Sequence, residues 1–184
     1  GQVKFVLPAS LDTLRKYNLM SQTPANINLV TSFAQKTFTN FANTALQGNY
    51  LIISNPVLYD NGAGVNYVEL YRQYRASRNG GSFNAKIYDI NELTEQFGFN
   101  IKKHPSGVRD FLRYASAQFA TTPQYTFIIG RGMTYADYTV HQSEPVADKL
   151  NLIQTFGYPA SDVLLAASPG TLIQTIPIGR LGAI

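Results

Sequence analysis

The chain has 184 residues, of which 45% are hydrophobic and 14% are charged. This length supports one domain with a substantial core, or one domain with an appended segment, and the composition excludes a disordered chain. The net charge of +4 comes from basic residues spread along the chain. Since nucleic-acid binders usually concentrate basic residues on one face, direct nucleic-acid binding is not expected.

Cysteine is absent, which excludes disulfides, thiolate metal ligands and a thiol nucleophile within these 184 residues. No apolar run approaches the length of a membrane span. The chain begins Gly1-Gln2 without a methionine or a signal peptide, and a lone leading glycine is typical of a cleaved tag. We therefore expect an excised piece of a longer protein.

Residues 1–49 are expected to form a lead-in segment with one or two helices. Ser10 can cap a brief helix. A second helix is predicted from Thr31 or Ser32 to about Gln47, where Gly48 stops it.

Residues 50–184 are expected to form an α/β subdomain, because strand and helix patterns alternate along them. Connections of this length make right-handed parallel crossovers. The fold predicted is therefore three-layered, with a mostly parallel sheet flanked by helices. The predicted strands are Asn49–Ser54, Phe83–Asp89, Tyr125–Ile129, Val163–Ala167 and Ile173–Ile178, and the predicted helices are Val65–Asn79, Asn91–Phe97 and Ser106–Phe119.

The uncharged run Tyr125–Ile129 is the predicted central strand, buried on both faces. It leaves the sheet through Gly130-Arg131-Gly132. Loops at the carboxyl ends of parallel strands usually carry the chemistry. Here no third glycine and no Lys-Ser/Thr pair follows, so the loop matches neither a dinucleotide-binding fingerprint nor a phosphate-binding P-loop.

The helix at Val65–Asn79 interleaves tyrosines with arginines, a composition that nucleic-acid readers also use. Helical spacing predicts Tyr71 and Tyr74 on the inner face and Arg72 and Arg75 on the outer face. An ordinary amphipathic helix is therefore the interpretation that we adopt.

The two histidines offer no recognisable catalytic or metal pattern. His104 precedes a helix start, where a capping or surface role is usual. His141 is expected in a loop with Asp137 and Glu144 near it in sequence, but their spacing matches no established ligand pattern. Asp60 supplies only one carboxylate to a turn-rich loop, too few for calcium. No Gly-x-Ser-x-Gly turn is present for a serine nucleophile.

Asp162 and Arg180 bracket the last two predicted strands. This arrangement predicts a partly buried ion pair, which is costly to break but weak evidence of catalysis.

Several segments together resemble the gingipain-type cysteine peptidases, including the sortase-like member of bacterial type IX secretion. Each segment alone is weak, whereas the ordered set, which covers about residues 50–184, is fairly specific. The matching segments are Leu51–Pro56, Tyr71–Arg75, Ile87–Glu92, Phe97–Asn100, Gly107–Ala115, Phe127–Gly130, Tyr158–Asp162 and Ile176–Leu181.

The resemblance implies the first subdomain of a caspase-like catalytic unit. In that family the catalytic His and Cys come later in sequence, so no catalytic, cofactor or metal residue is assigned here, and the fragment alone is predicted to be inactive. The motif residues carried over are structural: Gly130, Asp162, Gly179 and Arg180. Arg131 is the departure, because many members have an acidic residue there.

Three functions remain open. The first is a scaffold subdomain of a secreted or surface cysteine endopeptidase, whose partners are the catalytic half and a peptide substrate. The second is a non-catalytic interaction module of a surface or secretion assembly. The third is a flavodoxin-like nucleotide-binding domain, which the loop sequences disfavour.

Overall fold

The structure is a computed structural model that describes residues 23–27 and 31–184. The chain divides into two compact units, Gly1–Lys36 and Thr37–Ile184. In the described part of the first unit, Pro24–Asn26 form a 3-10 helix. The helix expected at Ser10 lies outside the described residues. The second unit contains the sheet that the sequence predicts.

Four parallel strands form the sheet in the described residues, in the order β2-β1-β3-β4. In β1, Tyr50 lies between Ala85 of β2 and Tyr125 of β3, and β3 pairs in parallel with β4 on its other side. The predicted parallel α/β sheet is therefore confirmed. The strands are β1 (Tyr50–Ser54), β2 (Ala85–Asp89), β3 (Tyr125–Ile129) and β4 (Ile178–Leu181).

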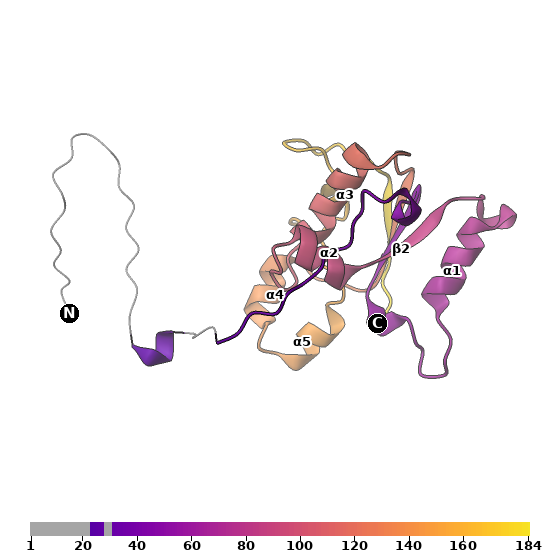
Figure 1. Ribbon diagram of the computed structural model, residues 1–184. Helices are drawn as coiled ribbons and strands as arrows, with labels where there is room; N and C mark the ends of the chain where they lie inside the picture. Colours follow the sequence, from indigo (N-terminus) through magenta and orange to yellow (C-terminus); the bar gives the residue numbers. More distant parts are fainter. Residues whose placement is uncertain (1–22, 28–30) are drawn as a thin grey trace, which may run out of the picture. The chain divides into compact units, whose positions relative to one another are not determined.

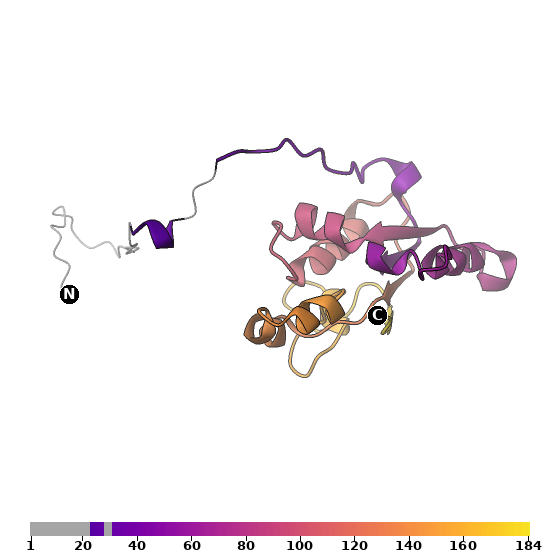
Figure 2. The ribbon, with the colours of Figure 1, turned by 90° about the horizontal axis from the view of Figure 1, so that it is seen from below.

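The helices cover the two faces of the sheet unequally. Helix α1 lies on one side, whereas α2 to α5 lie on the other (Figures 1 and 2). This asymmetry follows from right-handed crossovers. The connection from β1 to β2 crosses the sheet in the direction opposite to the connections from β2 to β3 and from β3 to β4, so its helix packs on the opposite face. The helices are α1 (Tyr67–Ala76), α2 (Ile90–Phe97), α3 (Ser106–Gln118), α4 (Tyr135–His141) and α5 (Pro145–Leu150).

Side chains directly before α1 and α2 cap free N–H groups of these helices. Asn66 accepts a hydrogen bond from the amide of Glu69 in α1 at 2.9 Å. Asp89, the last residue of β2, accepts from Asn91 at 2.8 Å, so the strand passes directly into α2. Such caps each stabilise a helix by about 1 kcal/mol.

The main core lies between the sheet and α3. An apolar stripe on α3, which runs from Val108 to Phe119, is buried along its whole length. It packs against the side chains of Leu51 and Ile53 from β1 and Ile128 from β3. Because side chains alternate along a strand, Tyr50 and Ile52 of β1 face α1 on the other side and form a second, smaller core.

The helix predicted up to Gln47 is wrong. Between residues 31 and 47 the chain forms only a turn and the 3-10 helix Thr44–Leu46. Asn40 and Asn43 accept hydrogen bonds from the amides two residues further on, at 3.1 and 3.0 Å. These local turns compete with helical hydrogen bonding.

The strands predicted at Val163–Ala167 and Ile173–Ile178 are also wrong. Val163–Leu165 form a 3-10 helix, and β4 begins only at Ile178. Pro177 explains the late start, because it has no N–H to donate and contributes only its carbonyl, which accepts from Thr126 at 2.9 Å. The apolar residues of this region are core residues within irregular backbone.

Two burial predictions need correction. On α1, Arg75 points inward, where its guanidinium lies 4.5 Å from the ring centre of Tyr50, while Tyr74 is exposed. The inner face therefore contains Val68, Tyr71 and Arg75, so it is rotated about the helix axis from the predicted face and excludes Tyr74. On β3, Tyr125 is 44% exposed, so the first residue of the strand is not buried as predicted.

Candidate functional site

The carboxyl ends of β1 and β3 form the point at which the strand order reverses, the usual place for a site in such sheets. Ser54, at the end of β1, donates a hydrogen bond to the carbonyl of Ile129 at 3.0 Å. The side chain of Asn55 caps the following 3-10 helix by accepting from Val57 at 3.1 Å. The hydrogen bond of Ser54 therefore holds the end of β1 against the end of β3, and that of Asn55 fixes the loop that follows β1.

Arg180 lies at the centre of this edge. Its guanidinium forms a two-pronged pair with Asp162, with Nε to Oδ2 at 2.7 Å and Nη2 to Oδ1 at 2.8 Å. The ion pair predicted from the sequence is therefore present. It is well shielded, since the two side chains are only 13% and 18% exposed.

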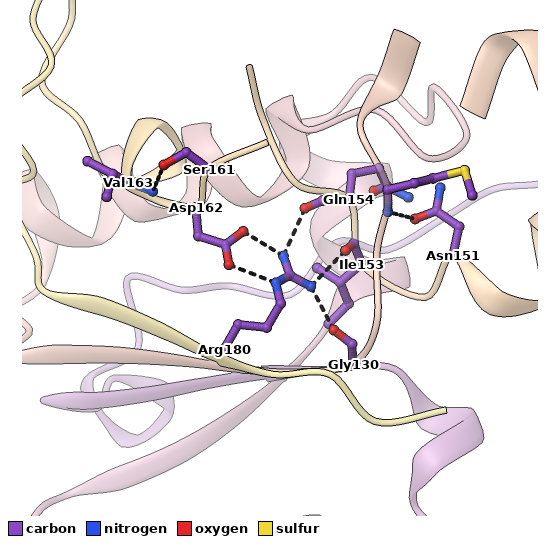
Figure 3. Close-up of polar contacts among 9 residues, drawn as sticks. Gly130, Asn151, Ile153, Gln154, Ser161, Asp162, Val163 and Arg180 are labelled. Atoms are coloured by element: carbon purple, nitrogen blue, oxygen red, sulfur yellow. Dashed lines mark hydrogen bonds and ion pairs between the residues drawn. The ribbon is translucent and has the colours of Figure 1, made fainter. Parts of the chain in front are cut away.

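The same guanidinium also donates to three backbone carbonyls. Nη1 bonds the carbonyls of Gly130 and Ile153 at 2.7 and 2.8 Å, and Nη2 bonds that of Gln154 at 3.1 Å. Figure 3 shows the guanidinium between the Asp162 carboxylate and these carbonyls. One side chain of β4 thus joins the loop after β3, the segment after α5 and the loop at Asp162. We call this group of contacts the Arg180 centre.

The Gly130-Arg131-Gly132 loop uses its backbone groups within the protein. The amides of Gly130 and Arg131 donate to the carbonyls of Leu181 and Ala183 at 2.9 and 2.7 Å. The amide of Met133 donates to the side-chain oxygen of Asn151 at 3.1 Å. A phosphate group would need such amides for its own oxygens, so this geometry suits a structural loop. The side chain of Arg131 is exposed.

His104 belongs to the start of α3. Its Nδ1 lies 2.6 Å from Oγ of Ser106 and accepts from the Ser106 amide at 3.2 Å, while its ring meets Tyr135 edge-on. Ser106 is buried, and its hydroxyl lies within hydrogen-bond distance of the His104 ring. This arrangement fits the capping role and gives the hydroxyl no access to a substrate.

His141 is not in a loop, as the sequence suggested, but is the last residue of α4. Its Nδ1 lies 2.8 Å from Glu144, and both side chains are exposed. The missed helix did carry a start signal, since Thr134 caps α4 by accepting from Asp137 at 3.1 Å. In the part of the chain that the structure describes, no group of three His, Asp or Glu side chains is arranged to hold a metal ion.

The two histidines should titrate on opposite sides of the ordinary histidine pKa of 6.5. Burial, assisted by Arg109, lowers the pKa of His104, whereas the hydrogen bond to Glu144 raises that of His141. By linkage, His104 favours the folded state above pH 6.5 and this contribution is lost as the pH falls through its lowered pKa. His141 contributes to stability in the opposite sense: its contribution is present below pH 6.5 and is lost as the pH rises through its raised pKa. NMR titration of the imidazole C–H signals measures both pKa values, and the variants His104→Gln and His141→Gln assign the signals. A pKa of His104 above that of His141 would contradict the contacts described.

An apolar groove of about 770 Å³ opens on the α1 side of the sheet, next to β4. Its floor is formed by Phe127 and Ile129 of β3 and Leu181 of β4, and its wall by Tyr71 of α1. The sequence did not reveal the groove, because it results from the uneven distribution of helices over the two faces.

The model of peptidase family C25 matches residues 43–183. The chain belongs to this family, the gingipain family of cysteine peptidases. The match covers the whole sheet and the Arg180 centre, so the resemblance seen in the sequence is confirmed. No curated protein and no solved structure matches the chain.

Family membership places the C25 chain among peptidases, which act on proteins. It does not supply a nucleophile here, because the 184 residues contain no cysteine. Of the residues singled out from the sequence, the structure brings together Asp162, Gly130 and Arg180, while Gly179 lies under the ring of Phe127 on the opposite face. No helix in residues 23–27 and 31–184 is both long and apolar enough to cross a membrane.

Proposed function

We propose that residues 50–184 are the scaffold subdomain of a gingipain-like cysteine endopeptidase. Its catalytic Cys and His would lie in a part of the polypeptide that follows Ile184. The observation that carries the proposal is the C25 match to a chain that has the family's sheet but no cysteine. Residues 1–49 would be a lead-in segment.

In this proposal, the thiolate attacks the peptide carbonyl after His removes its proton, and backbone N–H groups hold the oxyanion. The subdomain contributes rigidity. The Arg180 centre connects three loops at the carboxyl edge through five hydrogen bonds. Such an edge is a suitable platform, because catalytic groups must be held within a fraction of an ångström.

The apolar groove supports a contact with the catalytic half. Leu181 and Ile184 at its border are more than half exposed, and solvent-exposed apolar patches of this kind usually mark an interface. The substrate would be a peptide bound by the whole enzyme, at the bacterial surface or outside the cell, as the family resemblance implies.

A second candidate is a non-catalytic interaction module of a surface or secretion assembly. The same groove favours it, together with the exposed Tyr67 and Tyr74 on α1. It differs from the first in one requirement: it needs no Cys or His downstream of Ile184.

The two candidates are separated by the polypeptide encoded beyond Ile184. We expect the longer protein to hydrolyse peptides that contain Arg or Lys, and replacement of its downstream Cys by alanine to abolish this activity. Iodoacetamide should inhibit the longer protein, whereas the 184-residue chain should show no hydrolysis at all. Activity of the 184-residue chain, with contaminating proteases excluded, would contradict the proposal. A longer protein without Cys or His would support the interaction module.

A further inference from the structure

A second pocket, of about 420 Å³, is lined by residues of α2 and by the segments around Lys102 and Asp148. Its lining is polar, with Thr94 of α2, Asn100 and Gln154 among the uncharged groups. Four ionisable residues also line it: Glu95, Lys102, Lys103 and Asp148. Neither the C25 match nor the Arg180 centre assigns a role to this pocket.

The two neighbouring lysines occupy different environments within the pocket. Lys102 is exposed and forms an ion pair with Asp148 at 2.9 Å. Lys103 is partly buried, and its Nζ donates a hydrogen bond to the backbone carbonyl of Asn151. Its backbone has a φ of 56°, a left-handed conformation that non-glycine residues adopt only when the surroundings impose it. The fold therefore holds the Lys103 amine in a fixed position at the pocket.

Burial of Lys103 leaves a larger neutral, nucleophilic fraction of its amine than of the exposed, ion-paired amine of Lys102. Burial lowers the pKa of Lys103, and the charge of Lys102 adds to this effect, while Asp148 opposes it. The bond to Asp148 raises the pKa of Lys102. Glu95 lines the pocket but is not among the groups that shift either lysine. A neutral amine that donates one N–H to a carbonyl keeps its lone pair free for reaction.

We propose that Lys103 is a covalent binding site for small polar aldehydes, which it holds as an imine. The Nζ lone pair forms a C–N bond to the aldehyde carbon while the electrons of the C=O π bond move to the oxygen. Transfer of one proton from nitrogen to oxygen gives a carbinolamine. Loss of water then gives the imine, with no net oxidation or reduction.

The pocket suits each part of this reaction. The Lys102–Asp148 pair, which lines the same pocket, can donate and accept the protons that the dehydration requires. The amide side chains of Asn100 and Gln154 and the hydroxyl of Thr94 can bind hydroxyl groups of the ligand. The hydrophilic lining and the modest volume favour a hydroxyaldehyde over a long apolar aldehyde.

The test uses glycolaldehyde with cyanoborohydride near neutral pH, and peptide mass spectrometry to locate the reduced adduct. The sequence has seven lysines, so the comparison is internal and needs no variant. Lys103 should be labelled at least about threefold faster than Lys102 or the exposed Lys149, because a lower pKa leaves a larger neutral fraction. Equal or slower labelling of Lys103 would overturn the proposal.

Two variants test whether Lys103 reacts because its pKa is lowered or only because its amine is accessible to the aldehyde. Lys103→Arg keeps the donor to Asn151 and should abolish the label. Lys102→Gln removes the charge that lowers the pKa of Lys103 and frees Asp148 to raise it, so labelling of Lys103 should slow. Labelling of Lys103 that stays as fast in Lys102→Gln would also overturn the proposal, because accessibility alone predicts no change.

Discussion

Replacement of Arg180 by alanine is expected to lower the free energy of unfolding by about 3–5 kcal/mol. The substitution leaves the shielded carboxylate of Asp162 without its cation, and the carbonyls of Gly130, Ile153 and Gln154 without their donor. A buried charge that loses its partner is far more costly than an exposed one. For a chain of this size the melting temperature should fall by about 10 °C. Chemical denaturation of the 184-residue chain measures the change directly.

Two controls sharpen this result. Arg180→Lys keeps the charge but cannot form the two-pronged pair together with three carbonyl bonds, so it should lose most of the same stability. Arg72→Ala also removes an arginine from a carboxylate pair, with Glu69 at 2.5 Å, but both side chains there are about one-third exposed. It should change the stability by less than about 0.5 kcal/mol. A loss below about 1 kcal/mol in Arg180→Ala would show that the centre does not hold the edge together.

Gly132→Ala is the second substitution with a large expected effect. A Cβ atom at this position would lie 1.8 Å from the backbone oxygen of Ile153, far inside any possible contact. That oxygen is one of the carbonyls that Arg180 binds, so the loop can make room only by disturbing the Arg180 centre. We expect a loss of about 2–4 kcal/mol, measured as a shift of the denaturation midpoint at unchanged slope.

Gly182→Ala is the matched control, two residues after Arg180 in the same strand region. A Cβ there meets no atom within 4 Å, so stability should stay the same or rise by about 0.5 kcal/mol. If Gly132→Ala were as stable as Gly182→Ala, the tight packing of the loop on Ile153 would be contradicted.

The regular elements were predictable because their patterns are strong and local. The helical stripe of α3 and the apolar run of β1 each agree with the spacing of one secondary structure. Alternation of strands and helices, with the handedness rule, then led to the parallel sheet. Helices α4 and α5 were missed because they are short, with seven and six residues, and carry no long apolar stripe.

The irregular regions could not be predicted from patterns, because tertiary packing decides them. The aromatic side chain of Phe41 is buried against Phe97 and Phe111 although its segment forms no helix. Arg75 turns inward because the rings of Tyr50 and Phe83 offer it two faces at 4.5 and 4.8 Å. A charge that lies on aromatic rings contradicts the simple rule that polar residues face outward.

At the Arg180 centre, only the charged pair was visible in the sequence. Asp162 and Arg180 could be matched because opposite charges flanked apolar segments, whereas the other partners are backbone carbonyls, which every residue has. Lys103 was overlooked for a similar reason. Its environment depends on the carbonyl of Asn151, which lies 48 positions later in the chain.

The use of carbonyls at the Arg180 centre has a consequence for how freely this region can vary in sequence. Three of its five hydrogen bonds end on main-chain oxygens, so the side chains at positions 153 and 154 do not take part in them. These hydrogen bonds therefore do not restrict the residue type at either position, and an exchange for another residue of similar shape leaves them intact. Substitution tolerance should therefore be lowest at two residues, Asp162 and Arg180, in a group of contacts that extends over fifty positions of the chain.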